Sequence, residues 1–163
     1  MAKEFNVRSA TPDDAEAIMA LIIELAEFEK LRHQVTGTVD SLAAHLGGDS
    51  PAIEGLVAVN GEEILGYALF FFTYSTFRTQ PGLYLEDVYV RPAFRRRGIA
   101  TALIGKIAAI ALERNCGRFE WAVLDWNERA IAVYKGLGAE VLPDWRVCRV
   151  EGDRLLQLAK ESD

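Results

Sequence analysis

The stretch Leu83–Ala100 constrains the fold most, because it joins a strand to a helix through a basic loop. Leu83–Val90 is rich in strand-forming residues, and Arg91-Pro92 ends the run. Three arginines and Gly98 follow, and apolar residues then recur at helical spacing up to Asn115. The first N–H groups of a helix have no partner inside it, and with the helix dipole they attract anions. The sequence therefore predicts a strand, an anion-binding loop and a helix in this order.

The residue types of this loop suit a phosphate. Gly98 has no side chain, so a phosphate can approach the backbone, and the small Ala100 keeps the next position open. Arg95, Arg96 and Arg97 add positive charge. The loop lacks the Gly-Lys-Ser/Thr of a Walker loop and the three glycines of the Rossmann fingerprint. The alternative is a solvated arginine run before an ordinary helix.

The other elements follow from local signals. Asn60-Gly61 between two apolar runs predicts a hairpin. The patterns predict strands at 5–9, 53–59, 64–73, 83–90, 119–124 and 145–150, and helices at 12–31, 38–46, 98–115, 127–137 and 154–160. An antiparallel meander followed by a βαβ unit predicts a mixed α/β fold, and we expect one domain over residues 1–163.

Composition excludes several classes of protein. The net charge of −6 disfavours a nucleic-acid binder, and the longest apolar run, Tyr67–Phe72, is too short to span a membrane. The N-terminus shows no signal-peptide pattern, so a cytoplasmic location is expected. Cys116 and Cys148 match no zinc or CxxC spacing, and His33 and His45 are isolated. We therefore expect no metal and two reduced, partly buried thiols.

The loop also carries a family resemblance. Arg95-x-x-Gly98-x-Ala100 after such a strand resembles the pyrophosphate loop of the GCN5-related N-acetyltransferases. Further segments are similar to the diamine acetyltransferase branch of that family, which acetylates spermidine, spermine and thialysine: Phe28-Glu29, Phe72-Thr73-Tyr74, Tyr84-Leu85-Glu86-Asp87, Asp125-Trp126-Asn127-Glu128 and Tyr134-Lys135-x-Leu137-Gly138-Ala139. The resemblance implies a mostly antiparallel sheet with helices on both faces, and acetyl-CoA bound where the fourth and fifth strands splay.

The resemblance also implies which residues contact acetyl-CoA. The backbone of Val88, Tyr89 and Val90 would pair with the pantetheine arm like an extra strand. The diphosphate would lie against a second group, namely Arg95, Arg96, Arg97, Gly98, Ile99, Ala100 and Thr101. At the start of the next helix the implied contacts are Asn127, Arg129 and Ala130. Asn127 is equally well explained as the N-cap of that helix.

Two residues are the catalytic candidates. The resemblance places at Tyr134 a tyrosine that gives a proton to the departing CoA thiolate, and a phenol with a pKa near 10 is protonated at neutral pH. Glu86 is the candidate base for the amine nucleophile. The alternatives are a tyrosine that only packs on the sheet and a charge at a strand edge. Strand alternation puts Glu86, Val88 and Val90 on one face and Asp87 with Tyr89 on the other, unless a bulge intervenes.

The amine pocket is implied at four residues. Phe28 and Glu29 offer an aromatic face and a carboxylate to an ammonium group, and Glu86 with Asp87 adds negative charge. The alternative for the first pair is a helix end with a core phenylalanine and a solvated glutamate. Ser75 stands where spermidine/spermine acetyltransferases have an aspartate. This departure favours an amino-acid-like side-chain amine over a long polyamine.

The expected reaction is direct attack of the amine on the acetyl thioester in a ternary complex, without an acyl-enzyme. Two rival functions stay open, a protein or peptide N-acetyltransferase and a CoA-binding regulatory module without turnover. The resemblance also implies a homodimer.

Overall fold

The computed structural model describes residues 4–161, and the chain divides into two compact units. The first unit ends at Ala122 and the second begins at Val123.

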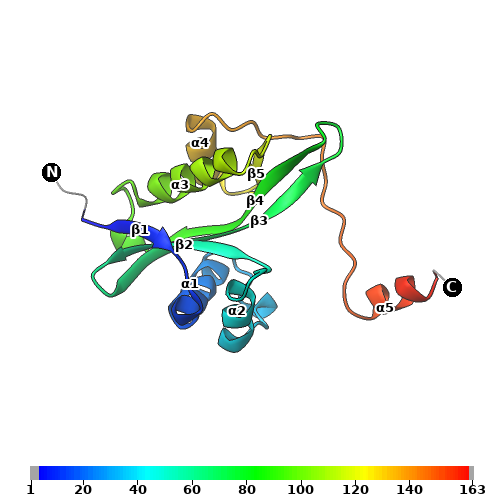
Figure 1. Ribbon diagram of the computed structural model, residues 1–163, viewed down its shortest axis with the longest axis horizontal. Helices are drawn as coiled ribbons and strands as arrows, with labels where there is room; N and C mark the ends of the chain where they lie inside the picture. Colours follow the sequence, from blue (N-terminus) through cyan, green and yellow to red (C-terminus); the bar gives the residue numbers. More distant parts are fainter. Residues whose placement is uncertain (1–3, 162–163) are drawn as a thin grey trace. The chain divides into compact units, whose positions relative to one another are not determined.

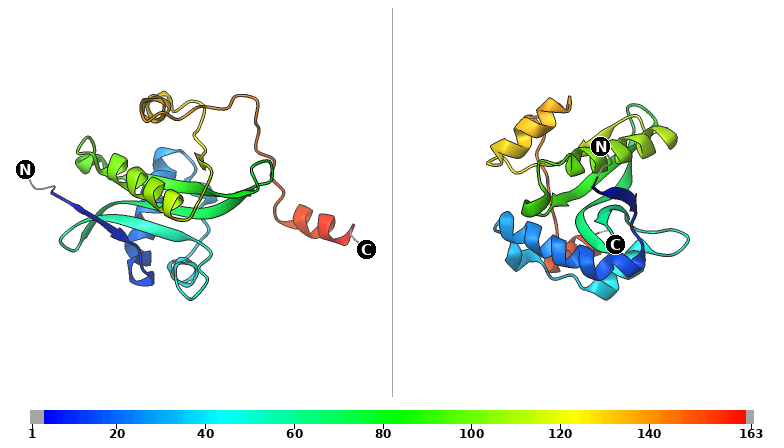
Figure 2. Two further views of the ribbon diagram at one scale, coloured as in Figure 1. Left: turned by 45° about the horizontal axis from the view of Figure 1, so that its top comes forward. Right: turned by 90° about the vertical axis from the view of Figure 1, so that its left-hand side faces the viewer.

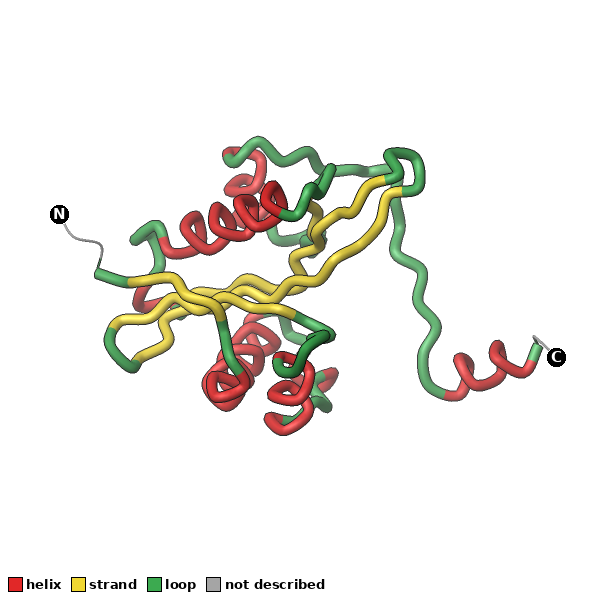
Figure 3. Tube along the Cα trace, viewed as in Figure 1, coloured by secondary structure: helices red, strands yellow, loops and turns green. Residues whose placement is uncertain are grey.

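The first unit is built on one five-stranded sheet (Figure 1). Its strands follow the spatial order β1-β2-β3-β4-β5, and their bounds are β1 Asn6–Ser9, β2 Glu54–Asn60, β3 Glu63–Ser75, β4 Gln80–Val90 and β5 Phe119–Trp121. The first four strands pair antiparallel, whereas β5 runs parallel to β4. Figure 3 shows that β3 and β4 form a long hairpin. The predicted mixed, mostly antiparallel sheet is confirmed.

Helices cover both faces of this sheet. Helices α1 (Ala15–Phe28) and α2 (Val39–Leu46) lie on one face, and α3 (Ile99–Glu113) lies on the other (Figures 1 and 2). Three short 3₁₀ helices precede or follow these elements, at Pro12–Asp14, Arg32–Gln34 and Pro92–Phe94. The core on the α1 face consists of Ile18, Leu21, Leu46, Val57, Ile64, Tyr67, Leu69 and Tyr89. On α3 the buried residues are Ile99, Leu103, Ile104, Ile107 and Ala111, which recur at the predicted helical spacing.

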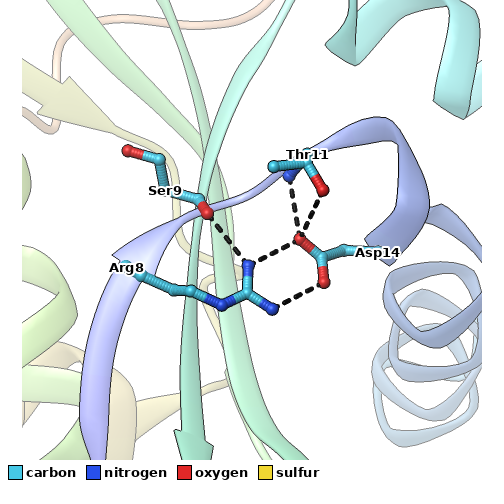
Figure 4. Close-up of polar contacts among 4 residues, drawn as sticks. All are labelled: Arg8, Ser9, Thr11 and Asp14. Carbon is cyan, nitrogen blue, oxygen red and sulfur yellow. Dashed lines mark hydrogen bonds and ion pairs between the residues drawn. The ribbon is translucent and has the colours of Figure 1, made fainter. Parts of the chain in front are cut away.

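The entry to α1 is fixed by a partly buried ion pair (Figure 4). Asp14 accepts two hydrogen bonds of 2.8 Å from the Arg8 guanidinium, and its Oδ2 also accepts from the backbone N–H of Thr11. The guanidinium lowers the pKa of Asp14, against the opposite effect of burial. Asp14 therefore links β1 to the 3₁₀ helix Pro12–Asp14 that leads into α1, and with Thr11 it forms the capping box of that 3₁₀ helix.

A bulge interrupts β4 next to the predicted catalytic glutamate. Leu69 of β3 pairs with Asp87, whereas the neighbouring Phe70 pairs with Leu85, so Glu86 is the extra residue. Leu69 and Phe70 lie on opposite faces of the sheet, hence their partners Asp87 and Leu85 do as well. Simple alternation through Glu86 is therefore wrong, because the bulge resets the faces at that residue.

The second unit holds two helices, α4 (Glu128–Gly136) and α5 (Asp153–Lys160). The predicted strand 145–150 is wrong, because this segment is irregular. Trp145 and Val147 are each 80% exposed, and no strand pairs with the segment among residues 4–161. Alternating residues favour a strand, but a ladder needs a neighbouring strand to supply its hydrogen bonds.

Smaller differences from expectation concern one strand end and one thiol. Strand β5 ends at Trp121 and not at Leu124. Cys116 is partly buried as expected, but Cys148 is exposed, and both are free thiols. No helix among the described residues has the length and apolar content that a membrane crossing requires.

Candidate active site

The edge of β4 that faces β5 is open over half its length. Strand β5 pairs only with Leu83–Leu85, and the Leu83 N–H donates to the Arg118 carbonyl over 3.0 Å at this edge. In the part of the chain that the structure describes, no strand pairs with this edge over Glu86–Val90. The two parallel strands thus diverge and leave backbone hydrogen-bonding groups available to an extended ligand.

The bulge decides which backbone groups face the open edge. A residue in a strand directs its N–H and C=O to one edge, and consecutive residues alternate. The Arg91 N–H donates to the Leu65 carbonyl of β3, so the preceding Val90 directs its groups to the open edge. By the same alternation Val88 faces the open edge and Tyr89 faces β3. Of the three residues predicted to pair with pantetheine, Val88 and Val90 are the ones with suitably directed backbone.

The loop before α3 has the backbone shape that its sequence predicts. Arg96 and Gly98 both have positive φ, 63° and 79°. A Cβ atom added to Gly98 would meet nothing within 4 Å, so the space in front of this residue is open. The N-terminus of α3 has no side-chain cap, and the Ala102 N–H donates to the Gly98 carbonyl over 2.9 Å. An open glycine beside uncapped N–H groups fits the diphosphate of acetyl-CoA.

The three arginines of the loop have different surroundings. Arg95 donates from Nε to the Val90 carbonyl over 2.9 Å, and its guanidinium lies over the rings of Phe28 and Tyr89. Arg97 is paired with Glu4 at 3.1 Å and lies over the Phe94 ring.

Arg96, in contrast, is exposed and has no hydrogen bond or ion pair with any residue of the described range 4–161. The sequence pattern does not distinguish the three arginines. In the fold, Arg96 is the one most available to an anion.

Two adjacent carboxylates of β4 differ in burial. Glu86 is exposed at the bulge, whereas Asp87 is half-buried on the α1 face. Burial raises the pKa of Asp87 to about 6, and the Glu86 and Glu29 carboxylates add to this effect. The Tyr67 hydroxyl donates to Oδ2 of Asp87 over 3.3 Å and partly opposes the rise. A carboxyl group with this pKa changes charge close to neutral pH.

The end of α1 contributes the other two predicted pocket residues. Phe28 is 47% exposed and Glu29 is half-buried, the reverse of a core phenylalanine beside a solvated glutamate. Burial raises the pKa of Glu29, and its carboxylate acts electrostatically on Asp87 and Tyr67. The structure therefore brings Glu29 near the β4 carboxylates, and the Phe28 ring lies against Arg95 of the loop.

The second unit carries the remaining predicted residues on α4. Asn127 caps this helix, since its Oδ1 accepts from the Ala130 N–H over 3.2 Å. Arg129 is exposed on the first turn, and Tyr134 is half-buried two turns along the helix from the cap. The N-cap interpretation of Asn127 is confirmed, and its contact with the cofactor stays a prediction.

Two further residues support the site and were not predicted from the sequence, namely Tyr67, which bonds to Asp87, and Arg91, which donates to Glu24 of α1 over 3.3 Å. Tyr89 was predicted only as a backbone contact of the cofactor, and its hydroxyl also donates to Glu24 over 3.3 Å. Their polar atoms interrupt otherwise apolar faces, and this pattern in the sequence could have marked them as candidates. Their partners depend on strand register and helix packing, which no local pattern contains.

The described residues contain no group of three His, Cys, Asp or Glu side chains placed to hold a metal ion.

Comparison with known proteins agrees with this geometry. Residues 19–139 match the family model described as "Acetyltransferase (GNAT) family". The chain is 43% identical to a thialysine N-epsilon-acetyltransferase of Mus musculus, over 94% of this chain and 96% of that protein. It is 30% identical to an L-ornithine N5-acetyltransferase of Arabidopsis thaliana, over 95% of this chain and 88% of that protein.

Solved structures agree on the fold. An integron cassette protein from the mobile metagenome of V. cholerae superposes with a TM-score of 0.81 at 22% identity, covering 98% of this chain and 99% of the other. The open strand edge, the glycine-containing loop and these similarities lead to one conclusion. The chain belongs to the GNAT family of acetyltransferases.

Proposed function

We propose that this chain transfers the acetyl group of acetyl-CoA to the side-chain primary amine of a small molecule of the thialysine, lysine and ornithine type. The observation that carries the proposal is the open edge of β4, which lies between the glycine-containing loop and the carboxylates Glu86 and Asp87. The family implies acetyl-CoA, and the relatives named for thialysine and ornithine acetylation support an amino-acid amine as acceptor.

Acetyl-CoA is proposed to lie along β4 and across the start of α3. The backbone of Val88 and the N–H of Val90 would pair with the pantetheine arm, since the Val90 carbonyl accepts from Arg95 Nε. The N–H groups of Ile99, Ala100 and Thr101 would face the diphosphate. The exposed Arg96 adds charge to this site. Arg95 and Arg97 support the loop through their bonds to Val90 and Glu4. On α4, Asn127, Arg129 and Ala130 are proposed as further cofactor contacts.

In the proposed reaction the amine attacks the thioester carbonyl directly. The new N–C bond forms as the C–S bond breaks, and the carbonyl oxygen receives a hydrogen bond from the Val88 N–H at the open edge. Glu86 accepts the proton that the amine loses, directly or through water, and the CoA thiolate takes a proton from the Tyr134 hydroxyl. The exposure of Glu86 at the bulge suits a group that exchanges protons with solvent.

The ammonium end of the substrate is proposed to lie against Phe28, Glu29, Glu86 and Asp87. None of the three carboxylates is in an ion pair with a residue of the described range. Burial, Glu86 and Glu29 raise the pKa of Asp87, and an incoming cation would stabilise its ionised form.

Ser75 bears on the length of the substrate. Its side chain is buried at the end of β3, and its Oγ accepts from the Arg78 N–H over 3.4 Å at the hairpin turn. A serine used in this way offers no negative charge to the far end of a polyamine. This supports a short amino-acid amine over spermine.

A panel of acceptors tests the substrate class. CoA-thiol release is measured with acetyl-CoA and thialysine, lysine, ornithine, putrescine, spermidine, spermine and a short N-terminal peptide. The proposal expects the highest kcat/KM among the first three. A peptide as the best acceptor would establish the protein-acetylating rival. Tight acetyl-CoA binding without turnover would favour a regulatory module.

A homodimer is part of the proposal. The second unit exposes a series of apolar side chains, namely Val141, Leu142, Trp145, Val147, Val150, Leu155, Leu156 and Leu158. Exposed apolar surface of this kind is typical of association sites. Sedimentation of the full chain would give twice the mass of one chain, and Trp145→Ser would shift it towards the monomer.

A further inference from the structure

A buried tyrosine lies directly behind one of the pocket carboxylates. Tyr67 is completely buried on β3, and its hydroxyl donates to Oδ2 of Asp87 over 3.3 Å. The other oxygen of Asp87, Oδ1, has no hydrogen bond with any residue between 4 and 161. Tyr67 is enclosed by the core and therefore does not itself contact a substrate. It reaches the pocket only through Asp87.

The charged and titratable groups around Asp87 are nearly all negative. Glu86 lies beside it on β4, Glu29 approaches from the end of α1, and Tyr67 approaches from β3. Tyr89, across from Tyr67, has its hydroxyl on Glu24 and its ring under Arg95. The groups that act on Asp87 include no cation among the described residues, and Tyr67 is the only one of them that favours the carboxylate.

The phenol of Tyr67 is suited to act as a permanent donor. Burial raises its pKa, and the neighbouring Asp87 raises it further. The hydroxyl therefore keeps its proton throughout the pH range in which a carboxyl titrates.

We propose that Tyr67 is a positioning residue for amine binding. Its hydroxyl holds one oxygen of the Asp87 carboxylate from inside the core, so that the other oxygen is fixed for the ammonium group of the substrate. This inference rests on the proposed function of the site, and it adds a residue that lies outside the pocket.

The hydrogen bond has a consequence for the pH at which the substrate binds. Asp87 holds an ammonium group only when ionised, so binding weakens as pH falls through its pKa of about 6. The Tyr67 hydrogen bond lowers this pKa. Removing the hydroxyl therefore raises the pKa, and the loss of binding begins at a higher pH. A purely structural hydrogen bond would change stability without moving this limit.

The test compares Tyr67→Phe with Thr73→Val in the full chain. Both variants delete one buried hydroxyl from β3, but the Thr73 hydroxyl has no hydrogen bond with Asp87 or with any other residue between 4 and 161. The pKa of Asp87 is measured by ¹³C NMR of its carboxyl carbon, assigned with Asp87→Asn. The KM of thialysine is measured from pH 5 to pH 8.5 at saturating acetyl-CoA, and thermal unfolding shows whether each variant is folded.

In Tyr67→Phe we expect the Asp87 pKa to rise by about half a unit, and the KM of thialysine to rise about twofold at pH 6 and little at pH 8. Both properties should stay at their native values in Thr73→Val. An unchanged Asp87 pKa in a folded Tyr67→Phe variant would overturn the inference. A native chain that binds acetyl-CoA and acetylates no amine would refute the proposed function instead, and the NMR titration would still be readable.

Discussion

The Nε atom of Arg95 donates to the carbonyl oxygen of Val90 over 2.9 Å, and this bond ties the basic loop to the end of β4. The same guanidinium lies 5.6 Å from the centre of the Phe28 ring and 5.4 Å from that of Tyr89. Arg95 therefore links the region proposed for the cofactor to the region proposed for the amine. This single side chain joins the loop to β4 and to the end of α1.

Replacing Arg95 by lysine should affect both substrates. A lysine ammonium cannot hold the carbonyl and cover two rings at once. We expect kcat/KM to fall about tenfold, with higher KM values for acetyl-CoA and for the amine. Steady-state kinetics with each substrate varied would show this. Arg78→Lys is the control, because Arg78 also donates to a backbone carbonyl, that of Gly117, but lies at the β3–β4 turn. Equal effects of the two changes would contradict the linking role.

The separate surroundings of Arg96 and Arg97 predict different effects of their removal. Arg96→Ala deletes an exposed guanidinium that has no partner within residues 4–161, so the KM of acetyl-CoA should rise about fivefold. Arg97→Ala should raise it less, because that guanidinium is already paired with Glu4. Isothermal titration of each variant with CoA and with dephospho-CoA would measure its affinity for the two ligands. A larger loss in Arg97→Ala would reverse the assignment.

Gly61 provides a matched control for Gly98 of the basic loop. Both have positive φ, 79° and 59°, and both have open space at the Cβ position. Changing either to alanine should lower the free energy of unfolding by about 1 kcal/mol, because a Cβ atom is unfavourable in this conformation. Only Gly98→Ala should also weaken CoA binding. The measurements are urea unfolding and CoA titration, and a similar loss of CoA affinity in Gly61→Ala would exclude a specific role for Gly98.

Much of this site follows from residue types in order along the chain. The arginines, Gly98 and the helix after them predict an anion site because helix N-termini have unpaired N–H groups whatever the rest of the fold does. Thr38 is found as a helix cap, with its Oγ1 accepting from the Ser41 N–H, and Asn60-Gly61 is found where β2 turns into β3. These features depend on a few neighbouring residues.

The features that escaped prediction depend on long-range packing. The contact between Tyr67 and Asp87 needs the register of β3 against β4, which the bulge at Glu86 shifts. The pairing of Arg97 with Glu4 joins residues far apart in the sequence. The segment 145–150 alternates like a strand but has no neighbouring strand in the described structure, so its local preference is not realised.

Asp14 should contribute to stability in a pH-dependent way. Its hydrogen bonds from Arg8 lower its pKa, so its stabilising effect is complete above the unfolded-state value near 3.8 and is lost as pH falls through the lower folded-state value. At pH 7, Asp14→Asn should lower the free energy of unfolding by about 1–2 kcal/mol. Urea unfolding at pH 7 and pH 3 would test this. The difference between the two proteins should shrink at pH 3, and a constant difference would contradict the ionic contribution.

The reaction itself is tested most directly by mixing the native chain with acetyl-CoA and thialysine and identifying the product. We expect one CoA thiol released for each acetyl group transferred, with the acetyl group on the side-chain nitrogen by mass spectrometry and NMR. We also expect kcat to fall about a hundredfold or more in Glu86→Gln, and to fall clearly in Tyr134→Phe. Bound acetyl-CoA that yields no acetylated amine, or full activity in Glu86→Gln, would contradict the proposed reaction.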